Sequence, residues 1–133
     1  MATAHLVPGT DPIDATLELF GGVVGGIAGG RLPDLIEPAT SPNHRDPAHA
    51  SLPCLTIALS ADQAIRREQE ALRMSAAKFR HLALVERDPV KRLGFGLIEV
   101  LARISAGFLP GVLGGYGSHI VLDSTTKKGV PVC

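Results

Sequence analysis

Residues 19–30, LFGGVVGGIAGG, decide which fold this chain can adopt. They contain glycine pairs that recur every four residues, at Gly21-Gly22, Gly25-Gly26 and Gly29-Gly30. Each glycine inside a helix costs about 1 kcal/mol relative to alanine, so only close packing against another backbone can offset six of them. Glycines four apart leave a smooth helix face on which a second helix can approach closely. We therefore expect a glycine-rich first helix, from Pro12 to about Gly30, at the centre of the fold.

Asp-Pro dipeptides mark the expected helix starts on both sides of this stretch. Aspartate is a strong N-cap and proline is favoured at the first helical position. The dipeptides occur at residues 11–12, 46–47 and 88–89, and a break at Pro110 predicts one further helix, from about Gly111. Glu99 and Arg103, at i and i+4 on the helix after Pro89, fit an exposed ion pair. The pattern predicts an all-α fold, a compact bundle of four or five helices in one domain over residues 1–133.

The composition excludes several classes of function. The 133 residues include 13 basic and 13 acidic side chains, and no tryptophan. Zero net charge and few aromatic rings argue against nucleic-acid binding. Cys54 and Cys133 are too few for a disulfide scaffold and lie in no motif that activates a thiolate. We expect a cytoplasmic protein with both cysteines reduced.

Membrane association is left open by the apolar runs. Residues 19–30 are too short to cross a bilayer, which needs roughly 20 apolar residues. The run from Ile104 to Leu122 is long enough, but it contains Pro110, five glycines and His119. We interpret it as two helical pieces and not as a span, with peripheral contact with a membrane as the remaining possibility. The glycine faces could also serve self-association into a homo-oligomer or pairing inside a membrane.

Candidate metal ligands gather in two polar segments that are far apart in the chain. The first, residues 29–50, contains Asp34, His44 and His49 among four prolines, and we interpret it as a stiff connection between helices. In the second, His119 and Asp123 are four residues apart and share one helix face. Imidazole and carboxylate are the ligands that zinc prefers. The two segments therefore predict one divalent metal site, although hydrogen bonding between packed helices explains the same residues equally well.

A resemblance to a known family favours the metal site. The matching residues are Leu32-Pro33-Asp34, then His44, Arg45 and His49, then Ser118, His119, Asp123, Thr126 and Gly129. In this order they resemble the motifs of the YdjM-like family of inner-membrane-associated metal-dependent hydrolases. That family is similar in turn to zinc-dependent phospholipase C and to fungal single-strand nucleases. About a third of the chain is covered by the resemblance.

The resemblance implies hydrolysis of a small-molecule or lipid phosphoester by a metal-activated water, with zinc as the metal. The ligands of this metal would be Asp34, His44, His49, His119 and Asp123. Asp34 would bind the metal or act as the base, and Arg45 would hold a phosphate oxygen. The chain departs from the family at Ile36, where a second acid is usual, and at Ala50, where serine is usual.

A second interpretation from another class is a non-catalytic helical module. In that case the polar cluster, with or without a metal, ties helices together or supports membrane association. An open coordination position would distinguish the two, because structural zinc sites are closed by protein ligands and catalytic sites keep room for water.

Overall fold

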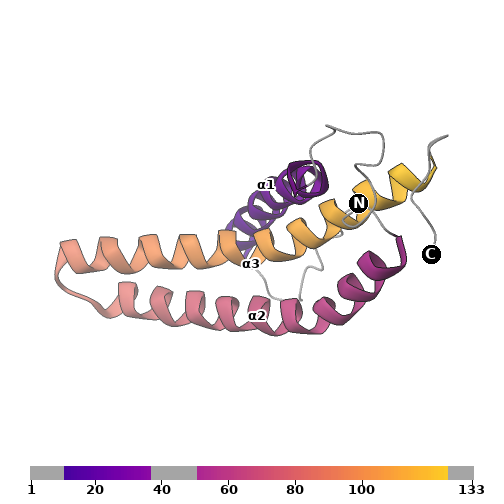
Figure 1. The fold of residues 1–133 in the computed structure, drawn as a ribbon. Coiled ribbons are helices and arrows are strands. Elements are labelled where there is room, and N and C mark those ends of the chain that lie inside the picture. Colours follow the sequence, from indigo (N-terminus) through magenta and orange to yellow (C-terminus); the bar gives the residue numbers. More distant parts are fainter. Residues whose placement is uncertain (1–10, 37–50, 126–133) are drawn as a thin grey trace.

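The computed structural model describes residues 11–36 and 51–125, and this part of the chain forms three α-helices (Figure 1). They are α1 (Pro12–Ile36), α2 (Ser51–Val85) and α3 (Pro89–Ser124). No strand occurs among the described residues, which confirms the all-α class. The expected number of helices, four or five, is not confirmed for this part of the chain, because the break expected at Pro110 does not occur.

Two of the Asp-Pro starts are confirmed by their capping geometry. The Asp11 carboxylate accepts a hydrogen bond from the backbone N–H of Ile13 at 3.0 Å, and Asp88 accepts one from Val90 at 2.9 Å. Each cap satisfies a backbone donor that has no partner inside the helix. The third dipeptide, at residues 46–47, lies outside the described residues.

Prolines inside α1 and α3 do not end these helices, contrary to the prediction. α1 continues through Pro33 to Ile36, so Asp34 belongs to a helix and not to a connection. α3 runs through Pro110 as one element of 36 residues. An interior proline removes one backbone hydrogen bond and typically produces a kink. Figure 1 shows such a change of direction in the second half of α3.

α1 and α3 cross with their backbones in direct contact, and the glycines permit this approach. A Cβ atom at Gly21, Gly25 or Gly29 would overlap the carbonyl oxygen of Ile104, Phe108 or Val112, respectively. Gly107, Gly111 and Gly115 of α3 are placed in the same way against Glu18, Gly22 and Gly26. Two rows of glycines with a four-residue repeat therefore interlock, as small residues do between closely packed membrane helices.

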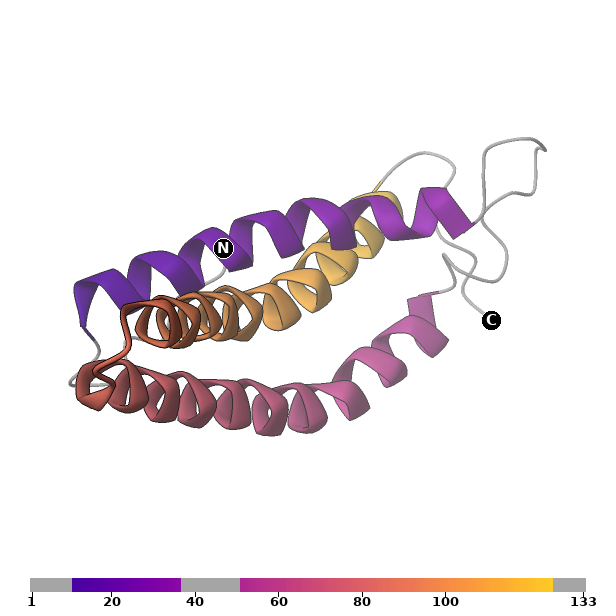
Figure 2. The same ribbon diagram turned by 90° about the vertical axis from the view of Figure 1, so that its left-hand side faces the viewer.

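α3, and not the glycine-rich α1, lies at the centre of the described structure. α3 packs against both other helices, whereas α1 and α2 make no direct backbone approach to each other. Figure 2 shows α1 on one side of α3 and α2 on the other. The glycines require one close partner, and α3 supplies it from a single side. The glycine rows thus explain a helix pair but do not require α1 to be surrounded.

The contact between α2 and α3 combines small side chains with one aromatic pair. Ala76 of α2 and Ala102 and Ala106 of α3 are buried. The rings of Phe79 and Phe95 lie with centroids 6.1 Å apart, near the loop that joins the two helices. An apolar core of this size is modest for helices of 35 and 36 residues. Polar contacts therefore contribute to holding α2 in place.

An ionic cluster links all three helices. Arg103 of α3 contacts Asp14 at 3.0 Å and Glu18 at 3.2 Å, both on α1. From α2, Arg73 pairs with Glu18 at 2.7 Å, and Arg80 pairs with Asp14 and with Glu99 of α3. The hydrogen bond to Glu18 raises the pKa of Arg73. The Arg80 and Arg73 pairs are the ionic connections from α2 to α1.

We predict opposite outcomes for alanine at two neighbouring glycines. At Gly25 the added Cβ overlaps backbone atoms of Phe108, so Gly25→Ala should destabilise the protein by about 1–3 kcal/mol. At Gly26 the nearest atom is the Gly111 carbonyl oxygen at 3.7 Å, an ordinary contact. Gly26→Ala should therefore be neutral or stabilising by up to about 1 kcal/mol. Thermal unfolding followed by circular dichroism measures both, and equal stabilities would contradict the interlocked packing.

Loss of Arg103 should destabilise the three-helix arrangement. Its side chain is 11% exposed and contacts two carboxylates, so Arg103→Met leaves Asp14 and Glu18 with one cation each. Removing one partner of a buried ionic group costs about 3 kcal/mol. The matched control is Arg66→Met, which breaks only the exposed pair with Asp62. Chemical denaturation should show a much lower midpoint for Arg103→Met than for the control, and similar midpoints would argue against the cluster's role.

Candidate functional site

Three helix ends lie toward the same end of the molecule. They are the C-terminal ends of α1 and α3 and the N-terminal end of α2 (Figures 1 and 2). The C-terminal parts of α1 and α3, which carry Asp34 and His119, therefore both lie toward this end of the molecule. α1 delivers the Leu-Pro-Asp motif at residues 32–34, and α3 delivers the motif that begins at Ser118.

Asp34 and His119 are the two predicted site residues that the structure brings together. Nε2 of His119 lies 3.7 Å from Oδ1 of Asp34. The His119 side chain is 20% exposed and its Nε2 atom is buried, whereas Asp34 is 65% exposed. The crossing of α1 and α3 at their glycine rows places these two residues within reach although 84 residues separate them in the sequence. The two motifs were expected to meet, and this pair is one contact between them.

The separation of this pair fits two ligands of one metal ion. A nitrogen at about 2.05 Å and an oxygen at about 2.1 Å from a tetrahedral zinc lie about 3.4 Å from each other. The observed 3.7 Å is close to this value and longer than a direct N–H···O hydrogen bond. An imidazole nitrogen and a carboxylate oxygen are also the donor types that zinc accepts. The two residues could therefore supply two ligands to such an ion.

The other predicted residues cannot be placed at this site by the described structure. Asp123 follows His119 by one turn of α3, and only its backbone is described. His44, Arg45 and His49 lie outside the described residues, in the segment that joins α1 to α2. Within residues 11–36 and 51–125, no group of three His, Cys, Asp or Glu side chains is arranged to hold a metal ion.

The ionic cluster was not expected from the sequence. Glu99 and Arg103 were expected to form an exposed pair, but the Arg103 side chain is only 11% exposed and contacts the carboxylates of α1 instead. Glu99 pairs with Arg80 of α2. One feature of the sequence does indicate the cluster. Asp14 and Glu18 precede the glycine row at the same four-residue spacing, so they lie on the helix face that packs on α3.

The cluster is structural in character, because its charges neutralise one another. Its three arginines and three carboxylates are each engaged in at least one ion pair. It also lies on different parts of α1 and α3 from Asp34 and His119. We therefore assign it to the stability of the fold and keep the helix ends as the candidate site.

The chain matches no protein-family model, no curated protein and no solved structure. A function has to be inferred from the residues of this chain and from their geometry.

Zinc binding should depend on His119 and not on His81. His119→Ala removes the buried imidazole that faces Asp34, and we expect the affinity for zinc to fall by more than about tenfold. His81 is an exposed histidine in the second half of α2, so His81→Ala is the matched control and should leave the affinity unchanged. Isothermal titration calorimetry of the full chain with zinc measures this difference. Equal affinities for the two variants would remove His119 from the site.

Proposed function

We propose that this chain is a metal-dependent hydrolase of phosphoesters, with its site where α1 and α3 end. The observation that supports this proposal is the approach of Asp34 to His119 at 3.7 Å. It joins two of the three motifs that resemble the YdjM-like family. The remaining motif, with His44 and His49, belongs to the segment that follows α1 in the sequence and starts three residues after Asp34.

The proposed ligand set combines residues of both polar segments defined by the sequence. Asp34 and His119 supply one carboxylate and one imidazole, and His44, His49 and Asp123 complete the set. A bound zinc ion would polarise the phosphoester and lower the pKa of a water molecule, which is the chemistry that such hydrolases use.

Other roles follow from the chemistry of the side chains. The Asp34 carboxylate is largely exposed, so a substrate and a water molecule can reach it. It could thus accept a proton from the attacking water. Arg45 would bind a phosphate oxygen, because guanidinium presents a rigid fork of donors that fits this group.

A second candidate is a structural role for the same ion. Asp34 belongs to α1 and His119 to α3, so an ion held between them would join the ends of two helices that already cross. A structural site uses only protein ligands, whereas a catalytic site keeps a position for water. Zinc binding without hydrolysis would therefore favour this second candidate.

Metal-loaded full chain should hydrolyse simple phosphoesters. We expect turnover of bis(nitrophenyl) phosphate or nitrophenyl phosphate that chelation abolishes and added zinc restores. Asp34→Asn should lower kcat by about a hundredfold or more, as expected for loss of a base. Arg45→Lys should mainly raise KM because a bidentate contact is lost.

Controls separate this outcome from misfolding. His81→Ala should keep full activity, and all variants should keep the helical circular dichroism of the parent chain. If the zinc-loaded parent protein hydrolysed neither substrate, this result would contradict the hydrolase proposal and leave the structural role of the ion.

A further inference from the structure

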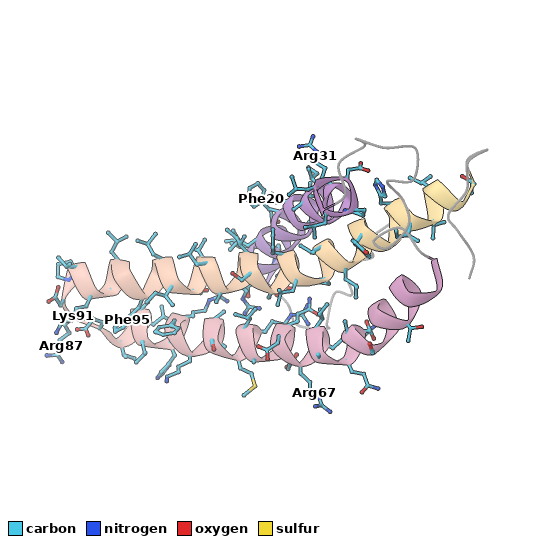
Figure 3. All side chains as sticks on the ribbon, in the orientation of Figure 1. Phe20, Arg31, Arg67, Arg87, Lys91 and Phe95 are labelled. Atoms are coloured by element: carbon cyan, nitrogen blue, oxygen red, sulfur yellow. The ribbon has the colours of Figure 1, made fainter. Side chains whose placement is uncertain are left out.

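The outward side of α1 carries large apolar side chains that no other described helix covers. Gly21, Gly25 and Gly29 occupy the side against α3, so the opposite side faces outward. Phe20 and Ile27 lie on that outward side and are 58% and 55% exposed. Arg31 follows on the same row, since positions i, i+7 and i+11 share one helix face. Figure 3 shows Phe20 and Arg31 on the side of the molecule away from α2.

The N-terminal half of α3 continues this apolar surface. In Figure 1, α1 crosses only the middle and later part of α3, which leaves the earlier part uncovered on that side. Val90, Leu97 and Leu101 form one row there and are 77%, 57% and 63% exposed. Their row lies opposite Phe95 and Glu99, which contact α2. We call this row, together with Phe20 and Ile27, the apolar side.

The opposite side of the molecule is charged. α2 exposes Arg66, Arg67, Glu68, Glu70 and Lys78 along its length. Figure 3 shows Arg67 pointing away from both α1 and α3. Charged and apolar side chains are thus segregated onto opposite sides of three layered helices, in the manner of a single amphipathic helix that lies on a membrane.

We propose that the apolar side rests in one leaflet of a lipid bilayer while α2 faces water. α3 is long and apolar enough to meet a membrane, and only 22% of its most apolar window is buried within the molecule. Burial of this side in acyl chains removes the exposed apolar side chains from water without covering the charged face of α2. This inference is independent of the hydrolase proposal.

The charges of the chain favour an orientation in the plane of the membrane over a crossing. The run of α1 between Glu18 and Arg31 has 12 residues, about 18 Å of helix, against a hydrocarbon core of about 30 Å. α2 lies beside α3, so a crossing by α3 would carry the exposed Arg66 and Arg67 of α2 toward hydrocarbon. Exposed charges at that depth are unfavourable.

Lipid also fits this surface better than a second copy of the chain. Arg31 ends the outward row of α1, where its long side chain can reach back to a lipid phosphate. Against the apolar side of a second copy, the same guanidinium would be buried without a carboxylate. The interlocking glycine rows, which would permit the closest approach of another helix, already contact each other inside the chain.

Flotation with vesicles tests the apolar side. Full-length protein from a detergent stock is mixed with phosphatidylcholine vesicles, with or without phosphatidylglycerol. The parent should float with the vesicles, and Ile27→Asp should lower partitioning by about tenfold to a hundredfold. Met74→Asp is the control, because Met74 is 67% exposed but belongs to α2. Equal flotation of both variants, or a parent that does not float, would overturn the proposal.

Fluorescence distinguishes the proposed orientation from the alternatives. The chain has no tryptophan, so Phe20→Trp, Leu97→Trp and Met74→Trp each introduce a single probe. Bromines at shallow acyl positions should quench the first two probes and leave the third unquenched. Quenching of the Met74 probe would indicate a crossing and contradict the proposal. A blue shift of the Phe20 probe that depends on protein concentration and not on vesicles would show a second copy and also contradict it.

Discussion

The close approach of α1 and α3 is the constraint on which the rest of this structure depends. Gly21, Gly25 and Gly29 place no side chain in the contact. The backbones therefore touch directly, and the two helices cross at a fixed register. That register places Asp14 and Glu18 against Arg103 on one side of the crossing. On the other side it brings Asp34 to His119. One packing contact therefore positions both the ionic cluster and the candidate site.

The ionic cluster shows how a helix with little apolar surface is held. α2 carries exposed charge along most of its length and shares only a small core of alanines and one aromatic pair with α3. Buried ion pairs are seldom a large net source of stability, but they discriminate strongly against arrangements that leave a charge unpaired. Arg73 and Arg80 pair with carboxylates on α1, although the backbones of α1 and α2 pack on α3 and not on each other. The cluster thus selects one arrangement of the three helices.

The sequence predicted local features more reliably than their arrangement. Helix starts at Pro12 and Pro89 followed from capping chemistry, which acts within a few residues. The end of α1 and the continuity of α3 did not follow, because the local chemistry of proline favours a break, whereas both helices continue through Pro33 and Pro110. For the candidate site, the order of the motifs that resemble the YdjM-like family indicated that Asp34 and His119 belong to one site. Helical periodicity alone could not have paired residues on two different helices. The partners of Arg103 were missed because a partner on the same helix, Glu99, satisfied the local pattern.

The order in which the helices acquire their contacts follows from the central position of α3. α2 and α3 are joined by a short turn, so their contact closes a small loop and can form early. α1 is synthesised first, yet its glycines make it a weak helix in isolation. Its partner residues, from Ile104 to Val112, are added more than 60 residues after Ile36. The glycine face of α1 therefore leaves the ribosome long before the surface on which it packs has been made, and the apolar side chains of α1 stay exposed to other chains during that interval.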